Sequence, residues 1–251
     1  LSPSAGPAEA PIPDIAGFEA IREISDPPND DYGPGTYTYP TDAVFSPGSY
    51  DLLEVLAGES GDGAVVDYVF SFLFDAPVLN PWGSPAGLSI QSIDVYLDYD
   101  PGEGTGRREL LDGRNAELPG DSGWEVALAI EGWDRAIAIP SGDGTYAEND
   151  TGMIVSVLAE QGLVTVRVPQ ASLPSGLDLA TAGIGVAIMS QEGFPSPGVR
   201  RVRDVETQAS QWSVGGGDSA AGDTRVLDAL LPDGGAQEAD LTRNLLPIVT
   251  P

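Results

Sequence analysis

The sequence predicts an all-β fold, a single antiparallel β-sandwich with extended N- and C-terminal arms. Short apolar stretches recur along the chain, clusters of Gly, Asp, Pro and Ser separate them, and convincing helical periodicity is scarce. The 32 glycines and 22 prolines among the 251 residues suit the turns of such a fold. We expect a first arm over residues 1–20, the sandwich over 21–235 and a second arm over 236–251.

The elements can be justified in chain order. Residues 1–17 are rich in proline, alanine and glycine, which favours an extended arm over a folded element. The first strong strand signal is VVDYVFSFLF at 65–74, where aromatic residues at alternate positions from Tyr68 to Phe74 share one face. Valine and leucine occupy the other face. We therefore expect a strand that is covered on both faces and central in its sheet.

The stretch IDVYLDYD at 93–100 alternates apolar and polar residues, which predicts a half-buried strand with one wet face. Further strand signals follow at short intervals, in the stretches WEVALAIEGW, AIAI, MIVSVLA, LVTVRV and GIGVAIMS. The best helical candidate is RVLDALL at 225–231. The glycine-rich stretch at 213–223 is interpreted as a loop and not as a phosphate site, which would need a following helix and a cation.

The charge of the chain is strongly negative. It has 39 acidic residues against 11 basic ones, all of them arginine, which gives a formal net charge of −28. Nucleic acid is excluded as a natural partner, because binding it depends on cationic side chains that displace counterions from phosphates. The surplus of carboxylates is compatible with solvation in concentrated salt and also with metal coordination. Both interpretations stay open.

The absence of histidine, cysteine and lysine removes whole classes of chemistry. Histidine-assisted nucleophiles, histidine- or thiolate-ligated zinc, Schiff-base lysines and disulfides are excluded. A pair of carboxylates of the glycosidase type is formally possible, but we do not expect an enzyme. No apolar stretch is long enough for a membrane span. A sequon at Asn149 predicts a glycosylation site and favours an exported protein.

The segment at 25–52, SDPPNDDYGPGTYTYPTDAVFSPGSYDL, combines carboxylates with turns that expose carbonyl groups. Calcium takes six to eight oxygen ligands of these kinds. The predicted calcium ligands are Asp26, Asn29, Asp30, Asp31, Asp42 and Asp51. The alternative is that these side chains only close turns through bonds to the backbone. A second candidate is DYDPGEG at 98–104, which is also interpretable as a hairpin turn.

Exposed aromatic residues are candidates for stacking on sugar rings. The candidates are Trp82, Trp124, Trp133 and Trp212, with Tyr37 and Tyr39. Among the tryptophans we favour Trp82, in a Pro-Trp-Gly turn, and we predict that it binds carbohydrate together with Tyr37 and Tyr39. The alternative is that aromatic residues near strand ends fill the core of the sandwich.

Four ordered blocks of the chain resemble one family. They are DPPNDDYGPGTYTYPTDAVFSPGSYDL, NPWGSPAGLSIQSIDVYLD, GWEVALAIEGW and QWSVGGGDSAAGDTRVLDALLP, which together extend from residue 26 to 232. In register, they resemble the C-terminal module of glucodextranase, a family also attached to amylopullulanases and surface proteins. The resemblance implies a DOMON-like or jelly-roll-like β-sandwich that attaches to carbohydrate or to the cell surface and does not catalyse a reaction.

The sequence thus favours an extracellular or cell-surface, non-catalytic β-sandwich that binds carbohydrate or a cell-surface polymer, with bound calcium. The alternative is a self-assembling subunit of an extracellular filament, tube or surface layer. In that case the terminal arms would add strands to neighbouring copies and form a homopolymer. The predicted anchors of the arms are Ile12, Ile15, Phe18, Leu245, Leu246, Ile248 and Val249.

Overall fold

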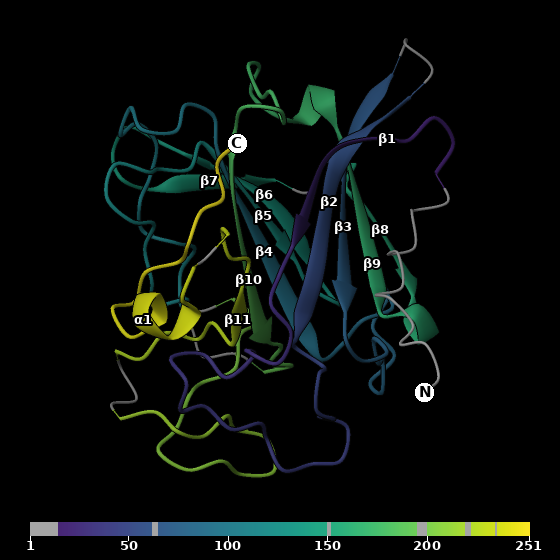
Figure 1. Ribbon diagram of the computed structural model, residues 1–251. Helices are drawn as coiled ribbons and strands as arrows, with labels where there is room; N and C mark the ends of the chain where they lie inside the picture. Colours follow the sequence, from purple (N-terminus) through teal and green to yellow (C-terminus); the bar gives the residue numbers. More distant parts are fainter. Residues whose placement is uncertain (1–14, 62–64, 150–151, 195–199, 219–221, 234) are drawn as a thin grey trace, which may run out of the picture.

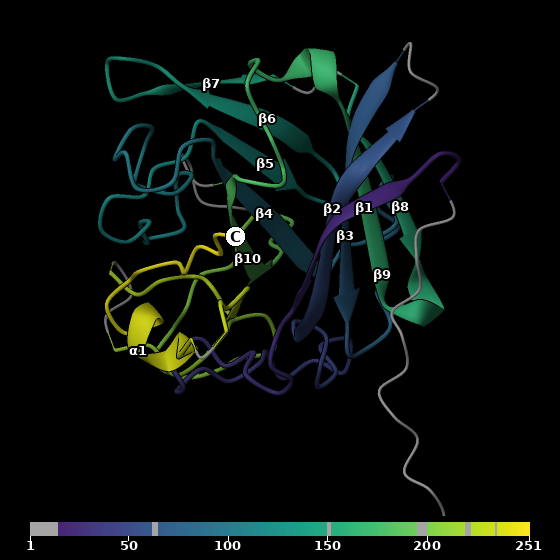
Figure 2. The same cartoon turned by 45° about the horizontal axis from the view of Figure 1, so that its top comes forward.

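The computed structural model describes residues 15–61, 65–149, 152–194, 200–218, 222–233 and 235–251. It confirms the predicted β-sandwich: two antiparallel sheets form separate layers, as Figures 1 and 2 show. None of the described helices is long and apolar enough to cross a bilayer.

The first sheet has five strands in the order β1-β2-β3-β9-β8. Their bounds are β1 Glu19–Ser25, β2 Leu52–Gly61, β3 Val66–Phe74, β8 Ile154–Leu158 and β9 Leu163–Pro169. The second sheet has six strands in the order β11-β10-β4-β5-β6-β7. Their bounds are β4 Gln91–Asp98, β5 Val126–Ile130, β6 Arg135–Pro140, β7 Tyr146–Asn149, β10 Gly183–Ser190 and β11 Asp228–Ala229. Short helical turns are η1 Ala159–Gln161, η2 Gln170–Ser172 and α1 Gln237–Leu241.

The main core lies between the sheets, and β3 contributes much of it. Tyr68, Phe70, Phe72 and Phe74 all belong to this core, as the alternation in the sequence predicts. The strand lies between β2 and β9, so its predicted central position is confirmed. Facing residues of β4, such as Val95, complete the packing from the other sheet.

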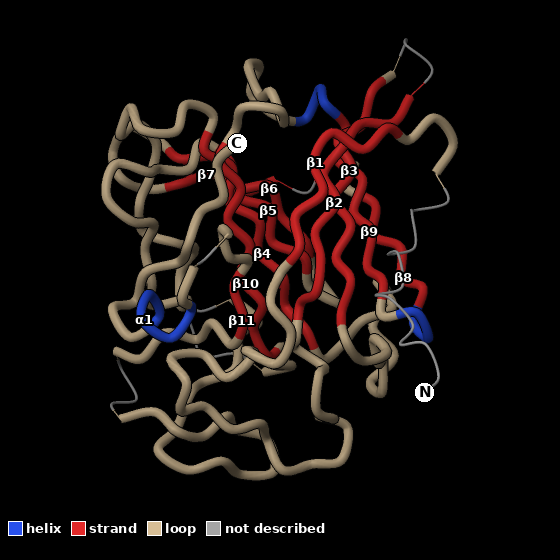
Figure 3. The backbone as a smooth tube through the Cα atoms, viewed as in Figure 1, coloured by secondary structure: helices blue, strands red, loops and turns tan. Residues whose placement is uncertain are grey.

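The predicted wet face of β4 is wrong, because every residue of this strand is buried. A second apolar cluster covers the outer face of the six-stranded sheet and includes Tyr96, Trp124 and Leu246. Figure 3 shows loops, drawn in tan, beside this sheet. Asp94 tolerates burial there because it accepts two hydrogen bonds from the guanidinium of Arg114, at 2.7 and 2.9 Å.

The helix expected at 225–231 is also wrong, since the segment is extended and contains the short strand β11. Leu227 and Leu230 pack in the core between the sheets, whereas Val226 and Ala229 pack in the outer cluster. An extended chain can direct apolar side chains into two cores on its opposite sides. Pairing with β10 supplies the backbone hydrogen bonds of this segment.

The C-terminal arm does not extend from the molecule. Val249 pairs with Ile184 of β10 through hydrogen bonds of 3.0 and 2.9 Å, and Leu245 forms a bridge with Glu117. Leu246 is fully buried, Val249 is nearly so, and Ile248 packs against the outer cluster. The prediction that this arm is extended is therefore corrected, because its apolar side chains are buried in the chain's own cores.

The N-terminal arm is described only in part. Ile12 lies outside the described residues, while Ile15 and Phe18 are half-buried just before β1. Since β1 begins at Glu19, the expected boundary at residue 20 falls inside the first strand.

Two long segments meet at one end of the sandwich, at the bottom of Figure 1. One is the loop at 26–51 between β1 and β2, and the other is the loop at 200–218 that follows β10. They are joined by a bridge between Thr38 and Gly215 and by a hydrogen bond of 2.8 Å from Thr41 N to Ser210 O. These loops carry most of the residues considered below.

Candidate functional site

The loop at 26–51 turns sharply directly after β1. Asn29 adopts a positive φ of 65° and Gly33 one of 57°, as tight turns require. A side chain at Gly33 would lie 2.3 Å from the ring of Tyr37, so glycine is needed there for space as well. These turns direct a series of carboxylates inward.

Five carboxylates gather here, four from this loop and one from β11: Asp26, Asp30, Asp31, Asp51 and Asp228. One oxygen from each of Asp26, Asp30 and Asp228 lies within 4.8 Å of the others. All five residues except Asp30 are buried. We call this group the carboxylate cluster. Within the described part of the chain, no arginine forms an ion pair with any of its members.

Backbone groups satisfy several of these oxygens. Leu231 N donates to Asp26 Oδ1 at 2.7 Å, and Leu52 N donates to Asp228 Oδ2 at 2.6 Å. Asn29 N donates to both oxygens of Asp51, at 3.0 and 2.9 Å.

The electrostatics of the cluster oppose ionisation. Burial raises the pKa of Asp26 to about 8, and the neighbouring Asp30 and Asp51 add to this shift. Burial and Asp51 likewise raise the pKa of Asp30 to about 6 and that of Asp31 to about 7. Burial raises the pKa of Asp228 well above its usual value, and Asp26 is its strongest charged neighbour. Without a counter-cation, the cluster concentrates carboxyl groups that repel one another when ionised.

A groove of about 670 Å³ lies at the same end of the molecule. Three tryptophans and a phenylalanine line it, with 41% of Trp82, 37% of Trp133, 42% of Trp212 and 95% of Phe194 exposed. Glu192, Arg201 and Arg203 contribute charged groups. We call this feature the aromatic groove.

Buried contacts hold the groove in shape. The rings of Trp82 and Trp212 lie edge to face at 6.0 Å, and each lies 6.1 Å from the ring of Phe45. Arg203 lies over the ring of Phe45, at 5.2 Å from its centroid. Its guanidinium also donates to the carbonyl oxygen of Trp212 and, at 2.8 Å, to the carboxylate of Glu192.

The turn that presents Trp133 is packed closely against its neighbours. Gly132 N donates to Gln191 Oε1 at 2.6 Å, next to the end of β10. A Cβ atom at Gly132 would lie 2.0 Å from the carbonyl oxygen of Leu88, so only glycine allows this approach. Arg201 lies over the ring of Trp133 at 5.8 Å.

Comparison with known families identifies the family of the chain. The sequence profile of the SLH-like C-terminal binding module of glucodextranase matches residues 21–245, nearly the whole chain. The chain belongs to this family. No curated protein gives a significant match to the chain. The resemblance seen in the sequence is thus confirmed, and in this glucodextranase-type module the carboxylate cluster and the aromatic groove lie within the matched residues.

Within this glucodextranase-type module, the sequence-predicted sugar contacts separate. Trp82 lines the groove, but Tyr37 is only 4% exposed and donates its hydroxyl to Thr224 O at 2.6 Å. Tyr39 packs edge to face against Tyr50 at 4.8 Å and donates to the carboxylate of Asp31. Tyr37 is therefore corrected to a core residue, and Tyr39 belongs to the surroundings of the carboxylate cluster.

The predicted metal ligands also separate. Asp26, Asp30, Asp31 and Asp51 come together, whereas Asp42 is half-buried elsewhere in the loop and accepts hydrogen bonds from Val44 N and from the side chain of Gln211. These bonds lower the pKa of Asp42, as is typical of a capped turn. Asn29 contributes its backbone N–H to Asp51.

The predicted glycosylation residue, Asn149, ends β7, and the rest of its sequon lies outside the described residues.

Sequence reasoning missed Asp228 and Phe194 as members of these sites. Trp133 and Trp212 were candidates for stacking and do line the groove, whereas the third such candidate, Trp124, is fully buried. Asp228 lies in an apolar stretch that was interpreted as a helix, and its distance along the chain from Asp26 conceals their proximity. A single carboxylate inside an apolar run was the available signal. Trp133 and Trp212 were visible as tryptophans beside turns, but their shared groove depends on the packing of three separate loops.

The second acidic candidate, at 98–104, is a turn. Asp98 accepts hydrogen bonds from Asp100 N at 3.2 Å and Gly123 N at 3.3 Å, and Glu125 accepts one from Tyr99 N at 2.8 Å. Asp98, Asp100 and Glu125 place oxygens within 4.8 Å of one another. Because backbone donors and Thr105 occupy these carboxylates, the group is adequately explained as a capped hairpin turn.

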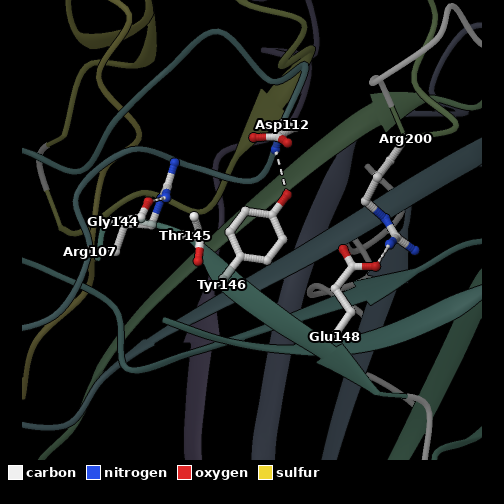
Figure 4. A pocket seen from close by; sticks show the side chains of 7 residues that line it. All are labelled: Arg107, Asp112, Gly144, Thr145, Tyr146, Glu148 and Arg200. Carbon is white, nitrogen blue, oxygen red and sulfur yellow. Dashed lines mark hydrogen bonds and ion pairs between the residues drawn. The ribbon is translucent and has the colours of Figure 1, made fainter. Parts of the chain in front are cut away.

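A polar recess of about 620 Å³ lies near β7 (Figure 4). The aromatic residue of this recess is Tyr146. The guanidinium of Arg107 lies over its ring, at 5.3 Å from the centroid, and its hydroxyl accepts a hydrogen bond from Asp112 N at 3.2 Å. Arg200 donates to Glu148 at 2.7 Å. With its ring covered and its charges paired, the recess offers less to a sugar than the aromatic groove does.

Proposed function

We propose that this chain is a non-catalytic module that binds a carbohydrate polymer, outside the cell or at its surface, through the aromatic groove. The observation that carries the proposal is the clustering of partly exposed Trp82, Trp133 and Trp212 in one groove. Membership in a family of binding modules of glucodextranase supports carbohydrate as the ligand class and a secreted or cell-surface location.

The chemistry of the groove suits a pyranose ring. Such a ring has an apolar C–H face, which packs on aromatic surfaces, and a polar rim of hydroxyl groups. Trp212 and Trp82 offer the surfaces, while Glu192 and Arg201 stand beside them as hydrogen-bonding groups. A few polar groups placed around an apolar lining are typical of specific ligand sites.

The same proposal includes the absence of catalysis. The chain has no histidine, cysteine or lysine to act as a base or nucleophile, and none of the carboxylates of the cluster lines the groove. We expect no turnover of α-glucans or esters. Hydrolysis that disappears when one carboxylate is changed to its amide would contradict this part.

Self-assembly by strand exchange would need free anchor side chains in the C-terminal arm. Leu246 and Val249 of this arm are buried in the chain's own cores, which disfavours that alternative.

The test is retention by insoluble α-glucan and by isolated cell-wall polysaccharide. Trp82→Ala and Trp212→Ala should each weaken retention about threefold to tenfold, since an aromatic contact contributes about 0.5–1.5 kcal/mol. Ile154→Ala, at an exposed apolar residue of edge strand β8, is the matched control and should bind as the parent does. If the parent is not retained by either polymer, or if both tryptophan variants bind normally, the groove is not the carbohydrate site.

A further inference from the structure

We propose that the carboxylate cluster is a binding site for a hard divalent cation of the calcium type, with Asp26, Asp30 and Asp228 as its primary ligands. This inference does not depend on the function of the aromatic groove. It starts from two oxygens that have no hydrogen-bond partner.

Asp26 Oδ2 and Asp30 Oδ1 are both buried without a hydrogen-bond partner in the described structure. Asp26 as a residue is only 7% exposed. A buried polar atom without a partner is destabilising, and a buried charge is more so. Carboxylate oxygens of these two residues and of Asp228 lie within 4.8 Å of one another, a separation that a single cation can span.

The other oxygens already face donors. Asp26 Oδ1 accepts from Leu231 N at 2.7 Å, and the two oxygens of Asp228 accept from Leu52 N at 2.6 Å and from Ala229 N at 2.8 Å. Backbone N–H groups aimed at carboxylates favour their ionised form. The backbone therefore fixes several carboxylate oxygens in place, and no arginine of the described residues forms an ion pair with them.

The ligand set indicates the type of cation. Every side-chain ligand is a carboxylate oxygen, and the chain has no histidine or cysteine to attract zinc or copper. Asp51 lies close enough to Asp26, Asp30 and Asp228 to interact with their charges, and Asp31 lies close to Asp30 and Asp51. Either would contribute a further oxygen, directly or through water. Calcium accepts six to eight oxygens in flexible geometry, which suits a crowded set of aspartates better than the strict octahedron of magnesium.

A cation here would join distant parts of the fold. Asp26 directly follows β1 of the five-stranded sheet, and Asp228 lies in β11 of the six-stranded sheet. Asp30 belongs to the loop between β1 and β2. One ion would therefore connect both sheets and the loop that carries Phe45 to the groove.

The experiment is calorimetric titration of the metal-free chain with calcium, combined with thermal melting in chelator and in calcium. The variants are Asp26→Asn and Asp30→Asn, because these are the two residues whose carboxylates have an oxygen without a hydrogen-bond partner. Asp42→Asn is the control, because it removes a carboxylate of the same loop that lies outside the cluster.

We expect the parent to bind calcium and to melt at a higher temperature with it. Each cluster variant should bind at least tenfold more weakly, whereas Asp42→Asn should bind as the parent does. In chelator, Asp26→Asn should melt no lower than the parent, because it removes one of several repelling carboxylates. The proposal is wrong if the metal-free parent shows no calcium binding, or if both cluster variants bind with the affinity of the parent. Asp30→Asn, at a half-buried residue, decides the matter if Asp26→Asn does not fold.

Discussion

The phenol oxygen of Tyr50 and the hydroxyl oxygen of Ser190 lie 2.6 Å apart in the buried interior, although 140 residues separate them in the sequence. On one side, Tyr50 N donates to the hydroxyl of Tyr39 at 3.3 Å, and Tyr39 donates to the carboxylate of Asp31. On the other side, Arg203 donates to the hydroxyl of Ser190 at 3.1 Å. These contacts form a continuous path from the carboxylate cluster to the floor of the aromatic groove.

The central bond of this path can be tested with Tyr50→Phe. The change removes a buried hydroxyl and keeps the ring, so we expect a loss of about 1 kcal/mol in the free energy of unfolding. Urea denaturation measures it. Tyr99→Phe is the matched control, because its hydroxyl makes an exposed bond to Pro174 O and should matter less. Equal effects of the two changes would argue against a special role for the buried bond.

Removal of the cation from the carboxylate cluster should weaken carbohydrate binding in the groove, because this path connects the two sites. If calcium orders the loop at 26–51, a chelator should lower both the melting temperature and the retention by carbohydrate, since Phe45 of this loop packs against Trp82 and Trp212. Parallel melting and retention assays with and without chelator measure the two effects. Asp26→Asn should respond to the chelator less than the parent does in both assays. A lower melting temperature with unchanged retention would show that the two sites are independent.

The buried ion pair of Arg114 and Asp94 should make a large contribution to stability. Arg114→Met would leave the fully buried carboxyl group of Asp94 without its ion-pair partner, which costs about 3–5 kcal/mol in the free energy of unfolding. Arg108→Met is the matched control, since its pair with Glu117 is about 43% and 42% exposed and should contribute no more than about 1 kcal/mol. Chemical denaturation of both variants provides the comparison. Similar losses for the two changes would contradict the expected effect of burial.

Asp98 should make the stability of the chain depend on pH. Burial, with the negative charges of Glu125 and Asp100, raises its pKa to about 6 in the folded chain, against about 4 when unfolded. The folded state therefore holds the proton more tightly, so this contribution is present below pH 4 and is lost as the pH rises through 6.

As the pH rises from 4 to 6, the free energy of unfolding should decrease by about 1–2 kcal/mol through Asp98, because solvent screening reduces the full effect of the pKa difference. Denaturation at a series of pH values gives the free energy of unfolding as a function of pH. Between pH 4 and 6 this free energy should change less steeply for Asp98→Asn than for the parent. The slope is the readout, since the variant also loses a hydrogen-bond acceptor. An unchanged slope would mean that Asp98 ionises normally in the folded state.

Several elements were predictable because their signals are local. The alternation of aromatic residues in β3 and the short apolar stretches of β5, β6, β8, β9 and β10 were enough to predict strands and a sandwich. The strand β4 was predicted correctly, but its burial was not, because the cover over Asp94 comes from a distant loop that carries Arg114. The stretch at 225–231 was mistaken for a helix for the same reason. Its apolar residues face two separate cores that no local pattern reveals.

The sequence by itself determined the chemistry that is available: a chain of carboxylates without histidine, cysteine or lysine, with an acidic turn-rich loop and a tryptophan in a tight turn. It also determined the fold class and the family, since these depend on patterns that extend along the chain. Only the tertiary structure decided which side chains meet. Asp228 joins Asp26, and Trp212 joins Trp82, because antiparallel pairing brings strand ends and loops together that lie far apart in sequence. The same packing excludes Asp42 and buries Tyr37, since the exposure of a residue depends on what the rest of the chain places over it.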